Sequence, residues 1–209
     1  MFKYLIIIFF ILLYIGAYVL GPHTVVSPSM EDTFLVGDRL LVLNYWYGLR
    51  HPFSAKKIIR GHEPARNEFL LFTYPIDPSE RHLKRCIAVG GDTLEIVAKK
   101  VFINGEEVPL PPGAKNADPN IIPMAEAGSG KRDFRPRMVL PDTTIYVMGD
   151  HRDFSLDSRI WGFLPKVNLR GRVGLILWSI DPEVPWTAIG KKFRWERTFK
   201  KPENLVRPE

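Results

Sequence analysis

The chain has 209 residues, of which 45% are apolar and 25% charged, and its net charge is +6. This length accommodates one domain with a sizeable core, and the apolar content argues against intrinsic disorder. A single cysteine, Cys86, excludes an intrachain disulfide, and no CxxC, HExxH or Cys/His cluster predicts a metal site. The basic balance suits an anionic surface, although a solvated basic surface explains most of it.

The first segment, Tyr4 to Leu20, is apolar, and no Asp, Glu, Lys or Arg occurs from Tyr4 through Met30. As a helix this segment spans about 26 Å, nearly a hydrocarbon core, which predicts a membrane anchor over residues 1–22. The alternative is a cleavable signal peptide, whose apolar region is usually about 7–15 residues long and ends in small residues. Lys3 on the amino side predicts a cytoplasmic N-terminus, with residues 23–209 outside.

The pattern after the anchor is that of short β-strands separated by turns. Asn104-Gly105 between β-formers over 101–108 is a strong hairpin signal. No convincing amphipathic helix follows the anchor. The sequence therefore predicts a mainly β fold of antiparallel strands preceded by one transmembrane helix. The other predicted strands are 39–43, 68–74, 82–89, 93–98, 144–148 and 171–179.

Two stretches have little periodicity. Residues 110–141 are rich in Pro, Gly, Lys and Arg and are predicted to form a loop-rich insertion or small subdomain, and residues 48–67 are predicted to form a shorter loop. The C-terminal residues 190–209 carry seven Lys/Arg against three Glu and contain aromatic residues. That mixture suits a membrane surface, and a solvated tail partly docked by its aromatics is an equal alternative.

Three short segments carry candidate chemistry. They are residues 25–30 (VVSPSM), residues 82–85 (HLKR) and residues 148–159 (MGDHRDFSLDSR), the last leading to Trp161-Gly162. Each alone is more typical of a loop, a half-exposed strand or a charged turn. Together, in this order after an apolar N-terminus, they resemble the type I signal peptidases, and the resemblance extends from the anchor to about Trp186.

The resemblance implies a role for each polar residue in these segments. Ser29 maps to the nucleophile and Lys84 to the general base. Ser27 and the backbone N–H of Ser29 would hold the oxyanion, and Ser155 would hydrogen-bond and orient the lysine. The remaining matches, which support the site without reacting, are Asp150, Arg152, Asp157 and Arg159.

Elementary chemistry agrees with a Ser–Lys pair. A serine hydroxyl needs a base, and a lysine of ordinary pKa is protonated at neutral pH. Lysine acts as a base only where burial disfavours its charged form, and the apolar neighbours of Lys84, Leu83 and Ile87, provide such an environment. Strand alternation sends Arg85 to the opposite face, away from the chemistry.

The resemblance also implies a substrate, a signal peptide cut after small residues in an Ala-x-Ala pattern. By position, Val25, Met30, Phe34 and His82 are candidates for lining the shallow pockets, and core packing is the equal alternative. A strand edge is suited to pairing with the peptide main chain.

Several residues depart from the family pattern. Asp32 stands where proline is usual, Asn67-Glu68 replaces a usual Gly-Asp, and His82 takes a place where an aromatic is common. His151 and Phe154 both occupy positions where asparagine is frequent. None of these removes a reacting group, so they bear on substrate preference. A base role for His151 is not favoured, because a base must reach a nucleophile.

The expected activity is that of a membrane-bound serine endopeptidase acting on exported preproteins, in contact with lipid. It needs no metal or cofactor, no nucleic acid and no obligate protein partner, and its catalytic domain lies on the extracytoplasmic side of the cytoplasmic membrane. The alternatives are a specialised conjugation or maturation peptidase with the same residues, and an inactive peptide-binding homologue. A self-cleaving repressor also uses Ser–Lys, but the apolar N-terminus argues against it.

Overall fold

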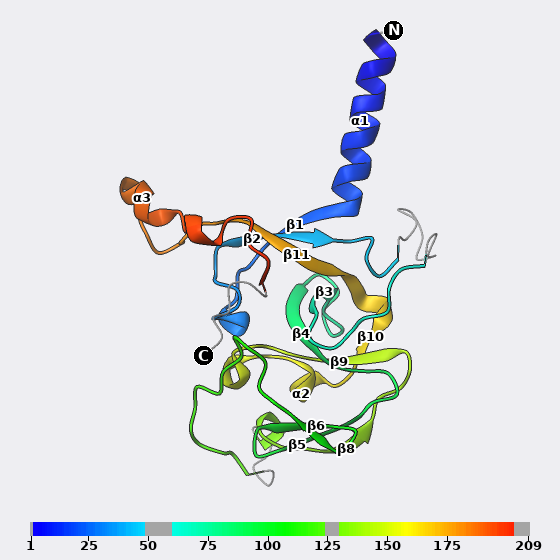
Figure 1. The fold of residues 1–209 in the computed structure, drawn as a ribbon, viewed down its shortest axis with the longest axis vertical. Helices are drawn as coiled ribbons and strands as arrows, with labels where there is room; N and C mark the ends of the chain where they lie inside the picture. Colours follow the sequence, from blue (N-terminus) through cyan, green and yellow to red (C-terminus); the bar gives the residue numbers. More distant parts are fainter. Residues whose placement is uncertain (1, 49–59, 124–129, 203–209) are drawn as a thin grey trace.

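The computed structural model describes residues 2–48, 60–123 and 130–202. The predicted loop 48–67, the insertion 110–141 and the C-terminal tail 190–209 therefore lie partly outside the described residues. The fold is mainly antiparallel β, as the sequence predicts, and its strands form a seven-stranded and a four-stranded sheet (Figure 1). After the first helix, the described helices are single turns.

The larger sheet has the order β1-β2-β11-β3-β4-β9-β10, and its pairings among the described residues are antiparallel. Strand β4 lies between β3 and β9, and it pairs with β9 only from Arg85 onward. Within the described ranges, the first half of β4 therefore has one edge without a strand partner. The strands of this sheet are β1 (Leu20–Thr24), β2 (Asp38–Leu43), β3 (Phe69–Thr73), β4 (Arg81–Val89), β9 (Thr144–Met148), β10 (Leu164–Pro165) and β11 (Leu169–Ser179).

The smaller sheet has the order β7-β6-β5-β8 and lies at the end of the molecule opposite α1 (Figure 1). Its β6–β7 turn contains Asn104 and Gly105, both with positive φ (56° and 88°), which confirms the predicted hairpin. The sequence-based interpretation of 110–141 as loop-rich is incomplete, because β8 lies within it and pairs with β5. The strands are β5 (Thr93–Val97), β6 (Lys100–Ile103), β7 (Glu106–Val108) and β8 (Arg135–Val139).

The N-terminal helix α1 (Phe2–Val19) projects away from the sheets (Figure 1). Leu20–Pro22, which the sequence analysis assigned to the anchor, instead belong to β1 and pair with β2. Across the part of the chain described here, no helix has the length and apolar character needed to cross a membrane. The prediction of a helix is confirmed, and the prediction of a membrane span is not.

The C-terminal segment is partly docked on the larger sheet. Arg197 donates two hydrogen bonds to the buried carboxylate of Asp38, at 3.1 and 2.7 Å, and one to the Thr33 carbonyl oxygen at 2.9 Å. Trp186, Trp195 and Phe199 nevertheless remain exposed.

The short helices described in the chain are α2 (Ser158–Trp161), α3 (Ile189–Lys192) and the 3-10 turns η1 (Pro28–Met30), η2 (Gly130–Arg132), η3 (Arg152–Phe154), η4 (Lys166–Asn168), η5 (Trp186–Ala188) and η6 (Trp195–Arg197).

The apolar core under η1 holds the first candidate segment in place. Met30 and Phe34 are buried together with side chains from β2, β3 and β11. The Phe34 ring meets the Phe69 ring edge-on, with their centroids 4.9 Å apart. Because η1 is packed by Met30 on one side, Ser29 has a fixed position relative to β4.

Candidate active site

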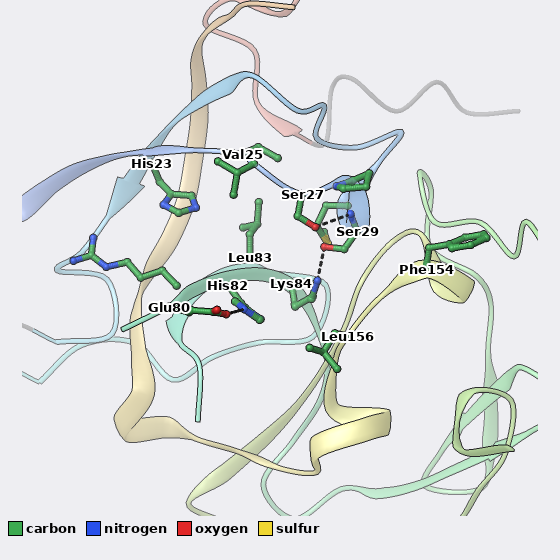
Figure 2. A pocket seen from close by; sticks show the side chains of 14 residues that line it. His23, Val25, Ser27, Ser29, Glu80, His82, Leu83, Lys84, Phe154 and Leu156 are labelled. Carbon is green, nitrogen blue, oxygen red and sulfur yellow. Dashed lines mark hydrogen bonds and ion pairs between the residues drawn. The ribbon is translucent and has the colours of Figure 1, made fainter. Parts of the chain in front are cut away.

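Ser29 and Lys84 meet at the surface of a cleft, although they are 55 residues apart in the chain. Ser29 lies in η1 and Lys84 on β4, and Lys84 Nζ donates a hydrogen bond to Ser29 Oγ (Figure 2). Ser29 is 7% exposed and Lys84 3% exposed. A hydroxyl and an amine are thus in direct contact in an environment that largely excludes water.

The environment of Lys84 favours its neutral form. Burial is the largest cause and lowers the pKa of Lys84 from 10.5 to about 8, although the charges of Asp157 and Asp150 oppose this shift. Within the described parts of the chain, no carboxylate lies within ion-pair distance of Lys84 Nζ. With a pKa of about 8, roughly a tenth of Lys84 is unprotonated at pH 7, far more than for an ordinary lysine, and this neutral form has a lone pair available for a proton.

Ser27 lies two residues before Ser29 as the N-cap of η1. Its hydroxyl accepts a hydrogen bond from the backbone N–H of Ser29 at 3.3 Å, and both serines line the cleft. This bond is longer than the usual N–H···O range, so an incoming oxygen competes with it easily. The Ser27 hydroxyl and the Ser29 N–H are two neighbouring donors suited to one developing oxyanion.

Ser155 approaches the site from the third segment. A Cβ on Gly149 would overlap both Ser155 Oγ and the Ser29 carbonyl oxygen, so only glycine fits at position 149. The Ser155 hydroxyl is buried and makes no hydrogen bond to Lys84. The orienting contact expected from the resemblance is therefore not made in this structure, and the role of Ser155 stays a prediction.

Asp157 and Arg159 form a buried ion pair that shapes the third segment. Arg159 Nε and Nη2 donate to the two oxygens of Asp157 at 2.9 and 2.8 Å, and the Gly149 N–H donates to Asp157 Oδ2 at 3.0 Å. Burial alone raises the pKa of Asp157, but the Arg159 charge and these hydrogen bonds bring it below its usual range. The pair thereby fixes Gly149, as its predicted supporting role requires.

Asp150 links the second and third segments to the residues that follow η1. It accepts two hydrogen bonds of 2.7 Å from Arg85 and one of 2.5 Å from the Thr33 hydroxyl. The N–H of the next residue, His151, donates to the Ser29 carbonyl oxygen at 3.2 Å. Sequence reasoning missed Arg85, Thr33 and Gly149, although Gly149 precedes Asp150 in the third segment and Arg85 follows Lys84.

Arg152 is buried but is not paired as closely as Arg159. Its backbone N–H donates to the Lys115 carbonyl oxygen at 2.9 Å. Burial and the neighbouring Arg159 lower the pKa of Arg152 to about 10. Its carbonyl oxygen accepts a hydrogen bond from Arg159 Nη2, so Arg152 supports the site mainly through its backbone.

The cleft has a volume of about 650 Å³ and extends on both sides of the Ser29–Lys84 pair. Of the predicted pocket residues, Val25, Met30 and His82 line it. Phe34 does not, because it is fully buried in the core against Phe69. His82 is held by Glu80 at 2.9 Å and stacks on Tyr74. Further lining residues that the sequence did not indicate are His23, Leu83, Phe154 and Leu156.

Comparison with known proteins adds three findings. Residues 1–178 match the family model described as signal peptidase, peptidase S26. The signal peptidase I of Pseudomonas fluorescens is 32% identical over 203 residues, covering 84% of this chain and 70% of that protein. The signal peptidase I of Aquifex aeolicus (strain VF5) is 30% identical over 239 residues, covering 88% of this chain and 89% of that protein.

A signal peptidase I structure from Enterococcus faecalis V583 also aligns with this chain. It covers 54% of this chain and 98% of its own, with a TM-score of 0.42 at 23% identity. The relationship therefore rests on the sequence matches and not on this superposition.

Proposed function

The chain belongs to the peptidase S26 family of signal peptidases and is a serine peptidase, and we propose that Ser29 is its nucleophile and Lys84 its general base. The observation that carries this proposal is the hydrogen bond between Lys84 Nζ and Ser29 Oγ in a buried setting. A neutral amine in contact with the hydroxyl is what a Ser–Lys mechanism requires.

The proposed acylation step starts with Lys84 neutral. Ser29 Oγ attacks the scissile carbonyl carbon while its proton passes to Lys84 Nζ. The Ser29 N–H and the Ser27 hydroxyl donate to the resulting oxyanion. The tetrahedral species collapses as the peptide C–N bond breaks, and Lys84 returns the proton to the leaving amine.

In deacylation a water molecule takes the place of Ser29 as the attacking group. Lys84, neutral again, accepts a proton from a water molecule that attacks the acyl-enzyme carbonyl carbon. The second tetrahedral species expels Ser29 Oγ, which recovers its proton from Lys84. The free enzyme and a new carboxylate result, and no step in this sequence calls on a metal or cofactor.

The specificity proposed for the cleft is for small residues before the cleaved bond. On one side of the pair the walls are formed by Val25 and Leu83, both nearly buried, and by His82 with its stacked Tyr74. Side chains held this rigidly leave shallow depressions, which suit alanine-sized groups. The unpaired edge of β4 before Arg85 supports a main-chain pairing with an extended peptide.

Membrane contact through α1 is a further part of the proposal. The apolar side chains of residues 4–10 in this helix are exposed, among them Tyr4 at 71%, Leu5 at 62% and Phe10 at 60%. A contiguous exposed apolar surface of this kind is typical of a lipid contact. Together with Lys3, it supports the expected location of the catalytic domain at the extracytoplasmic membrane surface.

The central test is cleavage of a preprotein by the purified full chain, with the cut mapped by mass. Wild type is expected to cut after a small residue, and Ser29→Ala to give no product while its circular dichroism is unchanged. Ser79→Ala, which alters an exposed serine, serves as the matched control and keeps full activity. Cleavage by Ser29→Ala at the wild-type rate would refute the assignment of Ser29 as the nucleophile. Cleavage of a panel of general preproteins by wild type separates a general from a dedicated peptidase.

The membrane proposal has its own test. Wild type should float with lipid vesicles in a density gradient, whereas Ile8→Asp with Phe10→Asp should remain at the bottom, because charged groups on α1 resist entry into lipid. If the double variant floats like wild type, α1 is not the membrane contact.

A further inference from the structure

We propose that Phe154 and Leu156 form an apolar subsite for the residues that follow the cleaved bond, so that the enzyme favours apolar or aromatic side chains there. This subsite rests on the proposed function, because it takes the Ser29–Lys84 pair as the reacting centre. It adds a preference on the leaving side of the bond, which the requirement for small residues on the other side does not cover.

The two residues lie in the cleft beside the reacting pair. Figure 2 shows Phe154 beyond Ser29, on the side opposite His23 and Val25, with Leu156 near Lys84. A peptide whose scissile carbonyl carbon reaches Ser29 Oγ therefore continues past the pair toward Phe154. The positions of these residues place them within reach of a bound chain.

Their exposure separates them from the rest of the cleft wall. Phe154 is 65% exposed and Leu156 47% exposed, whereas Val25 and Leu83 on the other side are 4% and 8% exposed. Neither residue belongs to an apolar core cluster of the described structure. Two exposed apolar side chains that line the same concave site are better explained by a ligand than by folding.

The segment that carries Phe154 is firmly held, which a subsite requires. Asp153 has its side chain 1% exposed and accepts hydrogen bonds of 2.8 Å from Lys99 Nζ and the Asp118 N–H. The Phe154 N–H donates to the His151 carbonyl oxygen at 3.2 Å. The rings of His151 and Phe154 are 4.8 Å apart, so the aromatic side chain is supported on one face and open on the other.

The direction of the bound peptide follows from the two ends of the cleft. The His23 end is bounded by β1 and by the part of β4 that lacks a partner on one edge. Strand edges suit the acyl part of the substrate, because that part must stay bound while water enters. The same end is joined to α1 through Leu20–Pro22, so a substrate held at the membrane enters there and its leaving part lies at Phe154.

Position 154 carries phenylalanine, where the family pattern that the sequence resembles frequently has asparagine. A phenyl ring offers a wide apolar face that a short amide does not. An apolar or aromatic residue packed on this ring is expected to improve kcat/KM about three- to tenfold over a serine at the same place.

The test uses peptides that share one sequence before the cleaved bond and differ at the first two positions after it, with Phe, Leu, Ser or Asp. For wild type, kcat/KM should be about three- to tenfold higher for Phe or Leu than for Ser. Phe154→Ala and Phe154→Asn should remove this ratio while keeping the requirement for small residues before the bond. Val139→Ala is the matched control, since Val139 is equally exposed at 65% but lies on β8.

The outcomes separate the subsite from the proposed function. If wild type cleaves the series and Phe154→Ala leaves the ratio unchanged, the subsite is wrong and the function stands. A Phe154→Ala variant that changes the preference before the bond, and not after it, also overturns the subsite. If wild type cleaves none of the peptides, the proposed function fails and the subsite fails with it.

Discussion

The two faces of strand β4 give two neighbouring basic residues different environments. Lys84 and Arg85 follow each other in the chain and are 3% and 5% exposed. Arg85 lies over the Phe69 ring, donates two hydrogen bonds to Asp150 and one to the Pro112 carbonyl oxygen. Among the residues that the structure describes, Lys84 makes one hydrogen bond, to the hydroxyl of Ser29.

This difference explains why only one of the two cations is suited to proton transfer. Burial raises the free energy of both charges, but a bidentate carboxylate offsets that cost for Arg85 alone. Without such a partner, Lys84 responds by losing its proton more readily, and its pKa falls to about 8. Reactivity on this strand therefore arises from a counter-ion that one face has and the other lacks.

The largest expected effect comes from making the Lys84 face permanently charged. Lys84→Arg introduces a guanidinium that stays protonated at any accessible pH, so no base remains for Ser29. We expect kcat for preprotein cleavage to fall by about 10⁴-fold, as for loss of a member of a catalytic triad. Lys100→Arg, at an exposed position of β6, is the control with wild-type kcat. A kcat of Lys84→Arg within tenfold of wild type would contradict the role of Lys84 as the base.

Breaking the Arg85 face should cost stability. Arg85→Met leaves the carboxylate of Asp150 buried without its bidentate partner. The free energy of unfolding is expected to fall by about 3–5 kcal/mol, as for one partner removed from a buried ion pair. Urea titrations of wild type, Arg85→Met and the exposed variant Lys100→Met measure this difference, and a loss below about 1 kcal/mol would argue against the role given to Arg85.

The same substitution one residue earlier should have the opposite sign. Lys84→Met replaces an unpaired buried amine with an apolar side chain of similar length, and the lowered pKa corresponds to about 3 kcal/mol of destabilisation that this change removes. At pH 7 the variant should therefore unfold with a higher free energy than wild type while being inactive. If Lys84→Met is no more stable than wild type at pH 7, burial of the Lys84 amine does not destabilise the fold.

The pH dependence of this gain provides an internal check. Between pH about 8 and 10.5 the unfolded chain keeps the lysine proton and the folded chain has released it. The unfolding free energy of wild type therefore rises with pH across this window, and below it the full penalty remains. The advantage of Lys84→Met should accordingly shrink between pH 8 and 10.5, and a gain that does not change with pH would have another cause.

The sequence predicted the two residues of this contrast, but not what each of them meets. Alternation along a strand correctly places Lys84 and Arg85 on opposite faces. The partners of Arg85 are the Asp150 carboxylate and the Pro112 carbonyl oxygen, which are distant from it in the chain, so only the folded structure brings them together. The family resemblance therefore predicted which groups react, and tertiary structure supplied their environment.

The same limit explains the misjudged elements. Leu20–Pro22 continue an apolar run and read as an anchor, yet Gly21 and Pro22 do not favour a helix and pair with β2. Strand β8 begins Arg135-Pro136-Arg137, which reads as a loop, and forms only because β5 offers an edge. Phe34 has the spacing of a pocket residue, but the packing of Phe69 draws it into the core.

The smallest expected effect is on the pH profile of cleavage, which reports most directly on the amine of Lys84. Only the neutral form of Lys84 accepts the proton of Ser29, so kcat/KM should rise about tenfold per pH unit below a pKa near 8 and level off above it. A carboxylate placed beside Lys84 would favour the charged amine and move this rise to higher pH. Leu156→Glu, at the cleft wall near Lys84, should therefore shift the profile upward, whereas Val139→Glu on β8 should leave it unchanged. A wild-type profile that is flat from pH 6 to 9 would mean that the amine on this face does not act as the base.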